Sequence, residues 1–430
     1  IQTGTMRFQV QGTSTWEGSA TAQAGATLNF HSGTHNWTAD SSLSGPGGLA
    51  ISNGTTDWDS SNFNLTGNVS LSGSGVFRVD EAIAVTGNFS QSAGDLRGSG
   101  EFRMNGPANS FTGGEWYDAG PKVIAGPLAI SSNSTKNIRG GARVRNESTV
   151  TWTGTTISIG EGCSWTNAPG SLLDVRTDGD FSFAWQPPMT FTNEGEVRRS
   201  LGNGEANWHL VFNNRPGGTV NVQTGTMRIQ TQGTSTWEGD ATAQAGATLN
   251  IHSGTHNWTA DSSLSGPGGF WVSGGTADWD SSNFSLTGTV TLSGNGVFRV
   301  DEAIALAGNY NQSGGDLRGV GEIRMNGPAN TFTAGEWYDA GPKVIAGPMA
   351  ISSGSTKNIR GGARIRNEST VTWTGGTISS GEGCSWTNAP GSLMDVRTDG
   401  DFSFAWQPPM TFTNEGKVRR SLGNGEANWH

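Results

Sequence analysis

The chain is a tandem duplication. Residues Gln2–His209 align without a gap on Gln223–His430, at an offset of 221 residues, and about 29 of the 208 aligned positions differ. Many of these differences exchange one apolar residue for another, as a packed core requires. Self-similarity at a fixed period is typical of repeat architectures. We therefore predict two near-identical structural repeats, residues 1–221 and 222–430, the second of them incomplete at its C-terminus.

A shorter period lies inside each copy. Tryptophans recur every 21 residues, and in the first copy each follows a glycine by four positions. These residues are Trp16, Trp37 and Trp58 with Gly12, Gly33 and Gly54, and the second copy repeats the tryptophans as Trp237, Trp258 and Trp279. If successive 21-residue segments stack, like positions lie above like. The tryptophans would then form a ladder of stacked rings and the glycines a recurring corner.

The segments between these markers have the pattern of short strands. Apolar residues alternate over four or five positions, as in Met6, Phe8 and Val10, and breakers such as Ser44–Gly48 separate the alternations. A period of two indicates a strand with one buried face, and no window has helical periodicity over more than about two turns. Two or three short strands in about 21 residues suit one circuit of a parallel β-helix.

We predict an all-β fold, a right-handed parallel β-helix (β-solenoid) of about 20 rungs with a rung period of about 21 residues. Two other all-β folds remain open. Tandem sandwich domains fit the 221-residue period but would not produce the 21-residue register. Propeller blades are about 40 to 45 residues long and carry a signature that this chain lacks.

Composition excludes several partners. Only 14% of the residues are charged, the net charge is −10, and the arginines are scattered, so we expect no nucleic-acid partner. No apolar run approaches 18 residues, so we expect no membrane insertion in this segment. The sequence opens inside a pattern that recurs later, and we expect the 430 residues to be part of a longer protein.

Three phrases of the sequence resemble the repeats of very large secreted or surface-attached bacterial proteins, the adhesin-like or haemagglutinin-like β-solenoid proteins. The phrases are Leu210–Met227, Ala24–His35 and Ser42–Gly48. The resemblance implies a parallel β-helix, an extracellular or cell-surface location and a structural or adhesive role. It supplies no catalytic residues.

Acidic residues around a turn suggest a calcium site. The segment from Asp174 to Asp180 places three carboxylates near a glycine, and the second copy repeats it. Calcium prefers such oxygen ligands, although the spacing matches no established calcium loop, and a solvated turn is the alternative. The calcium candidates are Asp174, Asp178, Asp180, Asp395, Asp399 and Asp401; no other cofactor is expected.

Other candidate sites are weaker. Asp57 with Asp59, and Asp80 with Glu81, are carboxylate pairs of the kind that glycoside hydrolysis needs. Each pair recurs with its surroundings in the second copy, and an enzyme rarely needs its site duplicated, so we expect no enzyme.

Histidine, aromatic and cysteine residues complete the candidates. His31 and His35, repeated as His252 and His256, have the spacing of zinc ligands on a helix, but they lie in a strand-like segment. Trp116–Tyr117 is a candidate for stacking on sugar rings. Cys163 and Cys384 occupy equivalent positions, too far apart in a solenoid to bridge each other, and are expected to be small buried residues or links to another chain.

These observations favour a structural extracellular repeat protein that forms or extends a solenoid fibre or stalk on or outside a bacterial cell. The alternative is an adhesin or carbohydrate-binding surface module. The expected partners are further copies or the continuation of a longer array, and surface glycans under the alternative.

Overall fold

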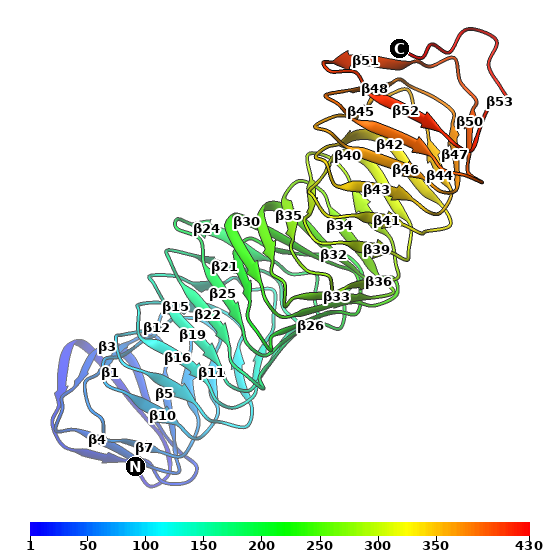
Figure 1. The fold of residues 1–430 in the computed structure, drawn as a ribbon. Helices are drawn as coiled ribbons and strands as arrows, with labels where there is room; N and C mark the ends of the chain where they lie inside the picture. The colour runs from blue at the N-terminus through cyan, green and yellow to red at the C-terminus, as the bar shows by residue number, and fades with distance from the viewer. The chain divides into compact units, whose positions relative to one another are not determined.

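The computed structural model describes residues 1–430 and contains strands and no helix (Figure 1). All strand pairs in it are parallel, and the chain forms a β-solenoid of about 20 turns with stacked strands about 21 residues apart. The predicted fold class is therefore confirmed. No part of the chain forms a helix long and apolar enough to span a membrane.

The chain divides into two compact units. Unit 1 comprises Ile1–Asn213 with Gly217–Thr219, and unit 2 comprises Asn214–Pro216 with Val220–His430. Each turn of a unit contributes strands to three stacked sheets, which we name faces A, B and C. The faces of unit 2 are named after the matching residues of unit 1. Strands β28 (Val211–Asn214) and β29 (Thr219–Val222) each have residues in both units.

In unit 1, face A consists of the first halves of β1 (Gly4–Trp16) and β3 (Ala26–Trp37), with β5 (Gly48–Ile51), β8 (Val69–Leu71), β11 (Phe89–Gln91), β14 (Asn109–Phe111), β17 (Leu128–Ile130), β20 (Thr149–Trp152), β23 (Leu172–Val175) and β26 (Glu196–Arg199). Face B consists of the second halves of β1 and β3, with β6 (Thr55–Trp58), β9 (Val76–Val79), β12 (Asp95–Arg97), β15 (Gly114–Trp116), β18 (Lys136–Ile138), β21 (Ile157–Gly160), β24 (Phe181–Trp185) and β27 (Glu205–Trp208). Face C consists of β2 (Ser19–Thr21), β4 (Ser42–Gly45), β7 (Phe63–Leu65), β10 (Ile83–Val85), β13 (Phe102–Met104), β16 (Pro121–Ile124), β19 (Arg143–Asn146), β22 (Ser164–Asn167) and β25 (Thr190–Asn193).

In unit 2, face A consists of the first halves of β30 (Thr226–Trp237), β32 (Thr248–Trp258), β40 (Tyr310–Arg318) and β42 (Asn330–Trp337), with β34 (Gly269–Val272), β37 (Val290–Leu292), β44 (Met349–Ile351), β47 (Thr370–Trp373), β50 (Leu393–Val396) and β53 (Lys417–Arg420). Face B consists of the second halves of those four long strands, with β35 (Thr276–Trp279), β38 (Val297–Val300), β45 (Lys357–Ile359), β48 (Ile378–Gly381) and β51 (Phe402–Trp406). Face C consists of β31 (Asp240–Ala243), β33 (Ser263–Gly266), β36 (Phe284–Leu286), β39 (Ile304–Leu306), β41 (Ile323–Met325), β43 (Pro342–Ile345), β46 (Arg364–Asn367), β49 (Ser385–Asn388) and β52 (Thr411–Asn414).

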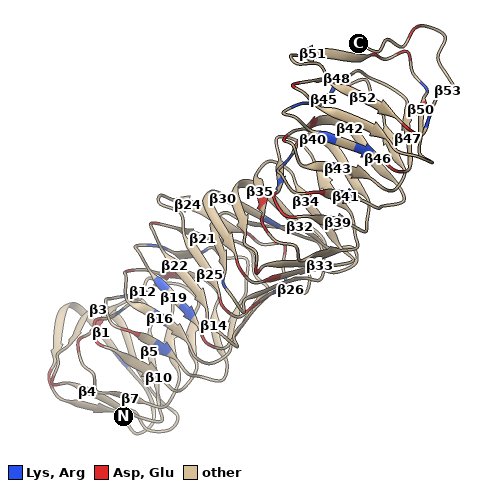
Figure 2. Ribbon diagram, viewed as in Figure 1, with Lys and Arg blue, Asp and Glu red and all other residues tan.

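The side chains alternate between the interior of the coil and its surface. In β5, for example, Leu49 and Ile51 are buried while Gly48 and Ala50 are half-buried. This is the strand period of two that the apolar alternation predicts. Twelve of the seventeen tryptophans are fully buried, so the aromatic residues serve mainly as core. Charged residues of both signs are distributed along each unit (Figure 2).

Candidate functional site

The tryptophans of the 21-residue period stack inside face B. In unit 1 the Trp16 and Trp37 ring centroids lie 4.7 Å apart with ring planes 7° apart, and Trp37 and Trp58 lie 4.8 Å apart. Val79 is the register partner of Trp58 in the next turn, where the column changes residue type. In unit 2, Trp237 and Trp258 are 4.4 Å apart, and Trp258 and Trp279 are 4.8 Å apart. The ladder therefore packs the core rather than forming a binding surface.

One glycine of the predicted corner is required by the backbone. Gly33 has φ 84°, and a Cβ there would lie 2.2 Å from Val10 Cγ2 and 2.7 Å from the Gly12 carbonyl oxygen. Only glycine meets both conditions without strain. Gly54 has a Cβ position 3.1 Å from the Gly33 carbonyl oxygen, a tight contact from the next turn. Gly12 itself has open space around it.

The histidine pair does not converge on a metal. His35 is buried and contacts Ser14 Oγ at 2.7 Å and the Ser32 carbonyl oxygen at 3.1 Å, whereas His31 contacts Ser52 Oγ at 2.9 Å. The four-residue spacing places the two rings in different environments because the segment is extended. No histidine belongs to a group of three or more side chains that could hold a metal ion. Burial lowers the pKa of His35, which is therefore a neutral core residue at neutral pH.

The calcium candidates are not gathered into one site. Asp174 accepts hydrogen bonds from Arg176 at 2.7 Å and from Arg198 at 3.0 Å. Asp178 pairs with Arg199 at 2.5 Å, and Asp180 accepts hydrogen bonds from Asn207.

The second copy repeats these pairs. Asp395 contacts Arg397 and Arg419, Asp399 contacts Arg420, and Asp401 contacts Asn428. Hydrogen bonds from Arg419, opposed by burial, hold the pKa of Asp395 far below its usual range. Each carboxylate thus serves a separate polar network, and calcium binding here stays a prediction.

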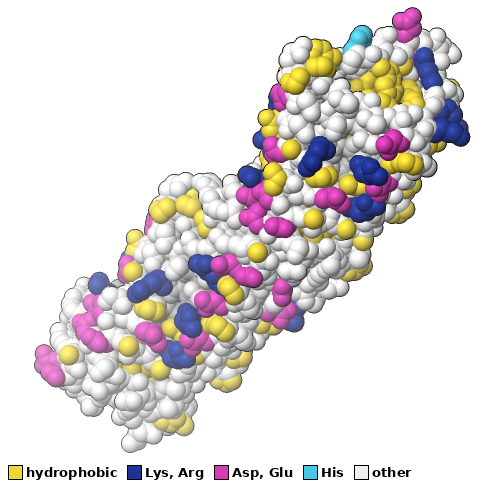
Figure 3. All heavy atoms as spheres, in the orientation of Figure 1, with side chains coloured by type: hydrophobic (Ala, Val, Ile, Leu, Met, Phe, Trp, Pro, Cys, Tyr) yellow, Lys and Arg dark blue, Asp and Glu magenta, His cyan; other side chains and the backbone are white.

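A different set of carboxylates does come together. Asp57, Asp59 and Asp80 each offer an oxygen, and these atoms lie within 4.8 Å of one another; Asp278, Asp280 and Asp301 repeat the cluster. Arg78 lies between the carboxylates, with its Nε 2.6 Å from Asp80 and 3.6 Å from Asp57. Figure 3 shows such basic and acidic side chains next to one another on the visible face. Glu81 is exposed and is not part of the cluster.

The environment shifts two of these carboxyl groups in opposite directions. Burial, and then the neighbouring Asp59 carboxylate, raise the pKa of Asp57. Burial also acts to raise the pKa of Asp80, but hydrogen bonds from the Ser99 N–H and from Arg78 outweigh it and lower the pKa. The three oxygens are of the type that a divalent cation prefers. The Arg78 guanidinium supplies one positive charge at this position and offsets part of the negative charge of the three carboxylates.

Comparisons with models of protein families, with curated proteins and with solved structures found no match for this chain.

The predicted sugar-stacking pair is wrong for Trp116. This side chain is fully buried, and its Nε1 donates a hydrogen bond to Gln91 Oε1 at 2.9 Å. The guanidinium groups of Arg97 and Arg139 lie over the Tyr117 ring, with their Cζ atoms 4.8 and 5.1 Å from the ring centroid. Arg139 also lies 5.2 Å from the Trp185 ring. This arginine–aromatic stack leaves Tyr117 engaged within the chain.

Sequence reasoning missed a set of buried lysines. Lys122 Nζ donates to the carbonyl oxygens of Tyr117, Asp118 and Gly120 at 2.6 to 2.8 Å, and so holds a turn between faces B and C. Lys343 makes the same bonds to Tyr338 and Asp339 in unit 2. Burial lowers the pKa of Lys122 to about 8. The only signal in the sequence was a lysine directly after a Gly-Pro turn.

The cysteines are buried free thiols. Cys163 and Cys384 are each 1% exposed. Burial raises the pKa of Cys163 to about 11. A thiol in this state is a poor nucleophile, which favours the packing role over a link to another chain.

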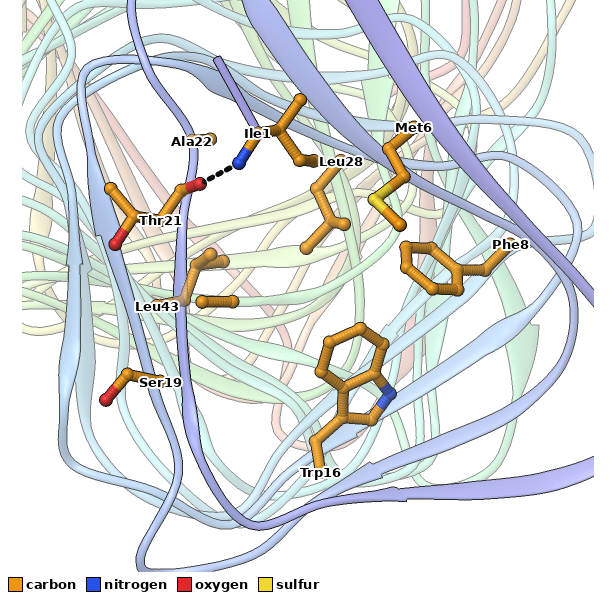
Figure 4. A pocket seen from close by; sticks show the side chains of 10 residues that line it. Ile1, Met6, Phe8, Trp16, Ser19, Thr21, Ala22, Leu28 and Leu43 are labelled. Atoms are coloured by element: carbon orange, nitrogen blue, oxygen red, sulfur yellow. Dashed lines mark hydrogen bonds between the residues drawn. The ribbon is translucent and has the colours of Figure 1, made fainter.

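An apolar cavity of about 350 Å³ lies beside the N-terminal residue (Figure 4). Its lining includes Met6, Phe8 and Trp16, and the Ile1 amino group donates to the Thr21 carbonyl oxygen at 2.7 Å. The matching residues of unit 2, Met227, Ile229 and Trp237, are fully buried core residues. The cavity thus lies where the matching side chains of unit 2 are packed as core, and its polar lining residues are Ser19 and Thr21.

Proposed function

We propose that this chain is a structural, non-catalytic segment of an extracellular bacterial solenoid fibre or stalk. The observation that carries the proposal is that buried polar side chains are bonded to neighbouring turns of the coil, and that the same bonds recur in both copies. A catalytic site would instead present such groups to a cleft.

A column of asparagines illustrates this use of polar groups. Asn146 Nδ2 donates to Asn167 Oδ1 at 2.8 Å, and Asn167 Nδ2 donates to Asn193 Oδ1 at 2.9 Å, across 21 and 26 residues. All three side chains are fully buried. Asn367, Asn388 and Asn414 repeat the column in unit 2. Stacked amides bond each turn to the next and resist separation of turns.

The asparagine column and the tryptophan ladder stabilise stacking along the coil. The buried lysines Lys122 and Lys343, which we name the lysine clamps, each hold a turn of the backbone within one circuit. Their near-exact repetition suits a part whose length is set by repeat number. The extracellular bacterial setting is supported by the resemblance of the repeats to surface-protein repeats. Under this proposal, the partners are further repeats of the same kind, either in one longer chain or by self-association.

The test compares the 430-residue chain with a chain that carries one additional 221-residue unit. Electron microscopy should show particles longer by roughly 50 Å, from about ten turns of about 4.8 Å each. Particles that grow in width, or compact particles with no gain in length, would overturn the proposal. Release of reducing ends from acidic polysaccharides, lost in Asp57→Asn, would overturn the non-catalytic part.

A further inference from the structure

The two copies differ in a concentrated way on one outward row. Face A of unit 1 presents Ala50, Ser70, Ser90 and Ser110 outward from four consecutive strands, since the residues on either side of each are buried. In unit 2 all four positions have changed, to Trp271, Thr291, Asn311 and Thr331. Over the whole alignment only about one position in seven differs.

Free drift of surface residues does not explain this row. The outward positions flanking it, Asn29 and Ala129, are unchanged as Asn250 and Ala350. Outward charged residues on face B, including Asp57 and Arg78, are also unchanged. Each of the four changes enlarges the side chain, and none introduces a charge. The second copy has therefore acquired an aromatic and polar row that the first copy lacks.

Trp271 lies on the outside of face A. Its neighbours in β34, Phe270 and Val272, are fully buried, while Trp271 is half-buried, and its Nε1 donates to Ser293 Oγ at 2.8 Å. The register partner Asn250 is only 1% exposed, whereas the matching Asn29, beside Ala50, is half-buried. The indole thus covers the strand beside it and keeps part of its surface in water.

Polar groups continue from the indole along the axis. Thr291 is the register partner of Trp271, Asn311 follows it, and Thr331 follows Asn311. Thr331 Oγ1 donates to Asn311 Oδ1 at 3.0 Å, while the Asn311 Nδ2 amide donates no hydrogen bond within the chain. Beyond Thr331, a shallow depression of about 180 Å³ is lined by Thr331, Ala350 and Thr372 of the same row.

The row is uncharged over its whole length. From Trp271 to Thr372 no outward side chain of face A is ionisable. The ionisable residues His252 and Arg228, which contact each other, lie in the preceding turns. The distance from Trp271 to Ala350 is roughly 19 Å, from four strand spacings of about 4.8 Å. An indole with adjacent hydroxyl and amide groups suits the apolar face and hydroxyl rim of a sugar ring. The row itself offers no cation to an anionic ligand.

We propose that the outward row Trp271, Thr291, Asn311 and Thr331 is a binding site for a neutral polysaccharide, which lies along face A of unit 2 with a sugar ring on the indole. This site goes beyond the structural role and does not depend on it. The first copy, with Ala50 in place of the indole, lacks the site.

The test uses the full 430-residue chain in native gels that contain a β-glucan, a mannan, a galactan or a dextran, with polygalacturonate as the acidic comparison. The variants are Trp271→Ala and a fourfold variant that also carries Thr291→Ser, Asn311→Ser and Thr331→Ser. These changes install the residues of the first copy, whose backbone is the same. Lys417→Glu, which also installs a first-copy residue, is the matched control.

We expect at least one neutral polysaccharide to retard the chain, with affinity at least tenfold lower in Trp271→Ala and lost in the fourfold variant. Lys417→Glu should bind like the parent chain. Retardation by none of the neutral polysaccharides, or equal retardation of the parent and the fourfold variant, would overturn the proposal. A dimer that dissociates in the fourfold variant, with no retardation, would identify the row as a contact between copies instead. The lengthening of the particles by an added repeat should be the same in all variants, so the two proposals fail separately.

Discussion

Buried His256 should make unit 2 sensitive to acid. Its Nε2 lies 3.0 Å from the Ser253 carbonyl oxygen, which can only accept, so the neutral ring donates from Nε2. Nδ1 then accepts from the Trp237 Nε1–H at 3.3 Å. A second proton on the ring would face the indole N–H and would also be buried without solvent. Burial accordingly lowers the pKa of His256 from 6.5 to about 4.

The sign and size of the effect follow from linkage. Between pH 6.5 and pH 4 the unfolded chain binds a proton that the folded chain excludes, so the free energy of unfolding falls as the pH falls. The full contribution is present above pH 6.5. A difference of about 2.5 pKa units corresponds to about 3 kcal/mol lost by pH 4. The loss should be greatest in the turns around Trp237 and Trp258, which the histidine joins.

Hydrogen exchange measured by mass spectrometry, corrected for intrinsic rates, reports this locally. Peptides covering β32 should lose about 3 kcal/mol of opening free energy between pH 6.5 and pH 4 in the parent chain. His256→Gln removes the titrating group and should abolish most of that dependence, although it weakens the turn at neutral pH. His252→Gln, a half-buried outward residue nearby, is the control and should keep the dependence. An equal pH slope in His256→Gln and the parent chain would refute the reasoning.

Three further perturbations test the elements of the coil. Gly33→Ala should destabilise the first turns by about 1 to 3 kcal/mol, because the new Cβ would clash with Val10 and the backbone is at positive φ. Hydrogen exchange in β3 that is unchanged from the parent chain would contradict this. Lys122→Met should lower the free energy of unfolding in urea by about 1 to 3 kcal/mol, because three carbonyl oxygens lose their donor. Lys417→Glu, a change at an exposed residue, should leave that free energy unchanged. Equal effects of the two changes would contradict a stabilising role for the Lys122 bonds. Asn167→Leu should likewise cost about 1 to 3 kcal/mol, because it interrupts the column between Asn146 and Asn193. The thermal midpoint measures this loss, and a midpoint equal to that of the parent chain would mean that the column adds no stability.

Where like residues stack on like, the sequence was sufficient to predict the structure. The 21-residue spacing of Trp16, Trp37 and Trp58 is the register in which these residues pair between strands, because a parallel coil repeats the same environment in every turn. The same period could have located the acidic cluster. Arg78 lies in register with Asp57 one turn later, which brings the Asp80 carboxylate to Asp57 and Asp59.

The failures occurred where the alternation of buried and exposed residues breaks. In β15 both Glu115 and Trp116 are buried, so a strand period of two misplaces one of them. Glu115 tolerates burial because Arg139 from the next turn lies 2.8 Å away. Asp174 likewise owes its burial to Arg198, which is 24 residues later. These partners lie in neighbouring turns at a separation of 24 residues, so the 21-residue period does not identify them.

The duplication separates two kinds of constraint within one molecule. Where the copies agree at the tryptophan ladder and the asparagine column, the residues hold one turn against the next. The lysine clamps, which also agree, hold the chain within a turn, and a change at any of these places would weaken the coil. Where the copies differ on the outward row of face A, stacking imposes no requirement, because the small residues of unit 1 and the larger ones of unit 2 occupy the same register. A role present in only one copy can therefore arise on this row without cost to the scaffold. Trp271 is the largest of these changes, since it adds an indole where the first copy has a methyl group, and it is the residue at which a binding function separate from the coil should be sought first.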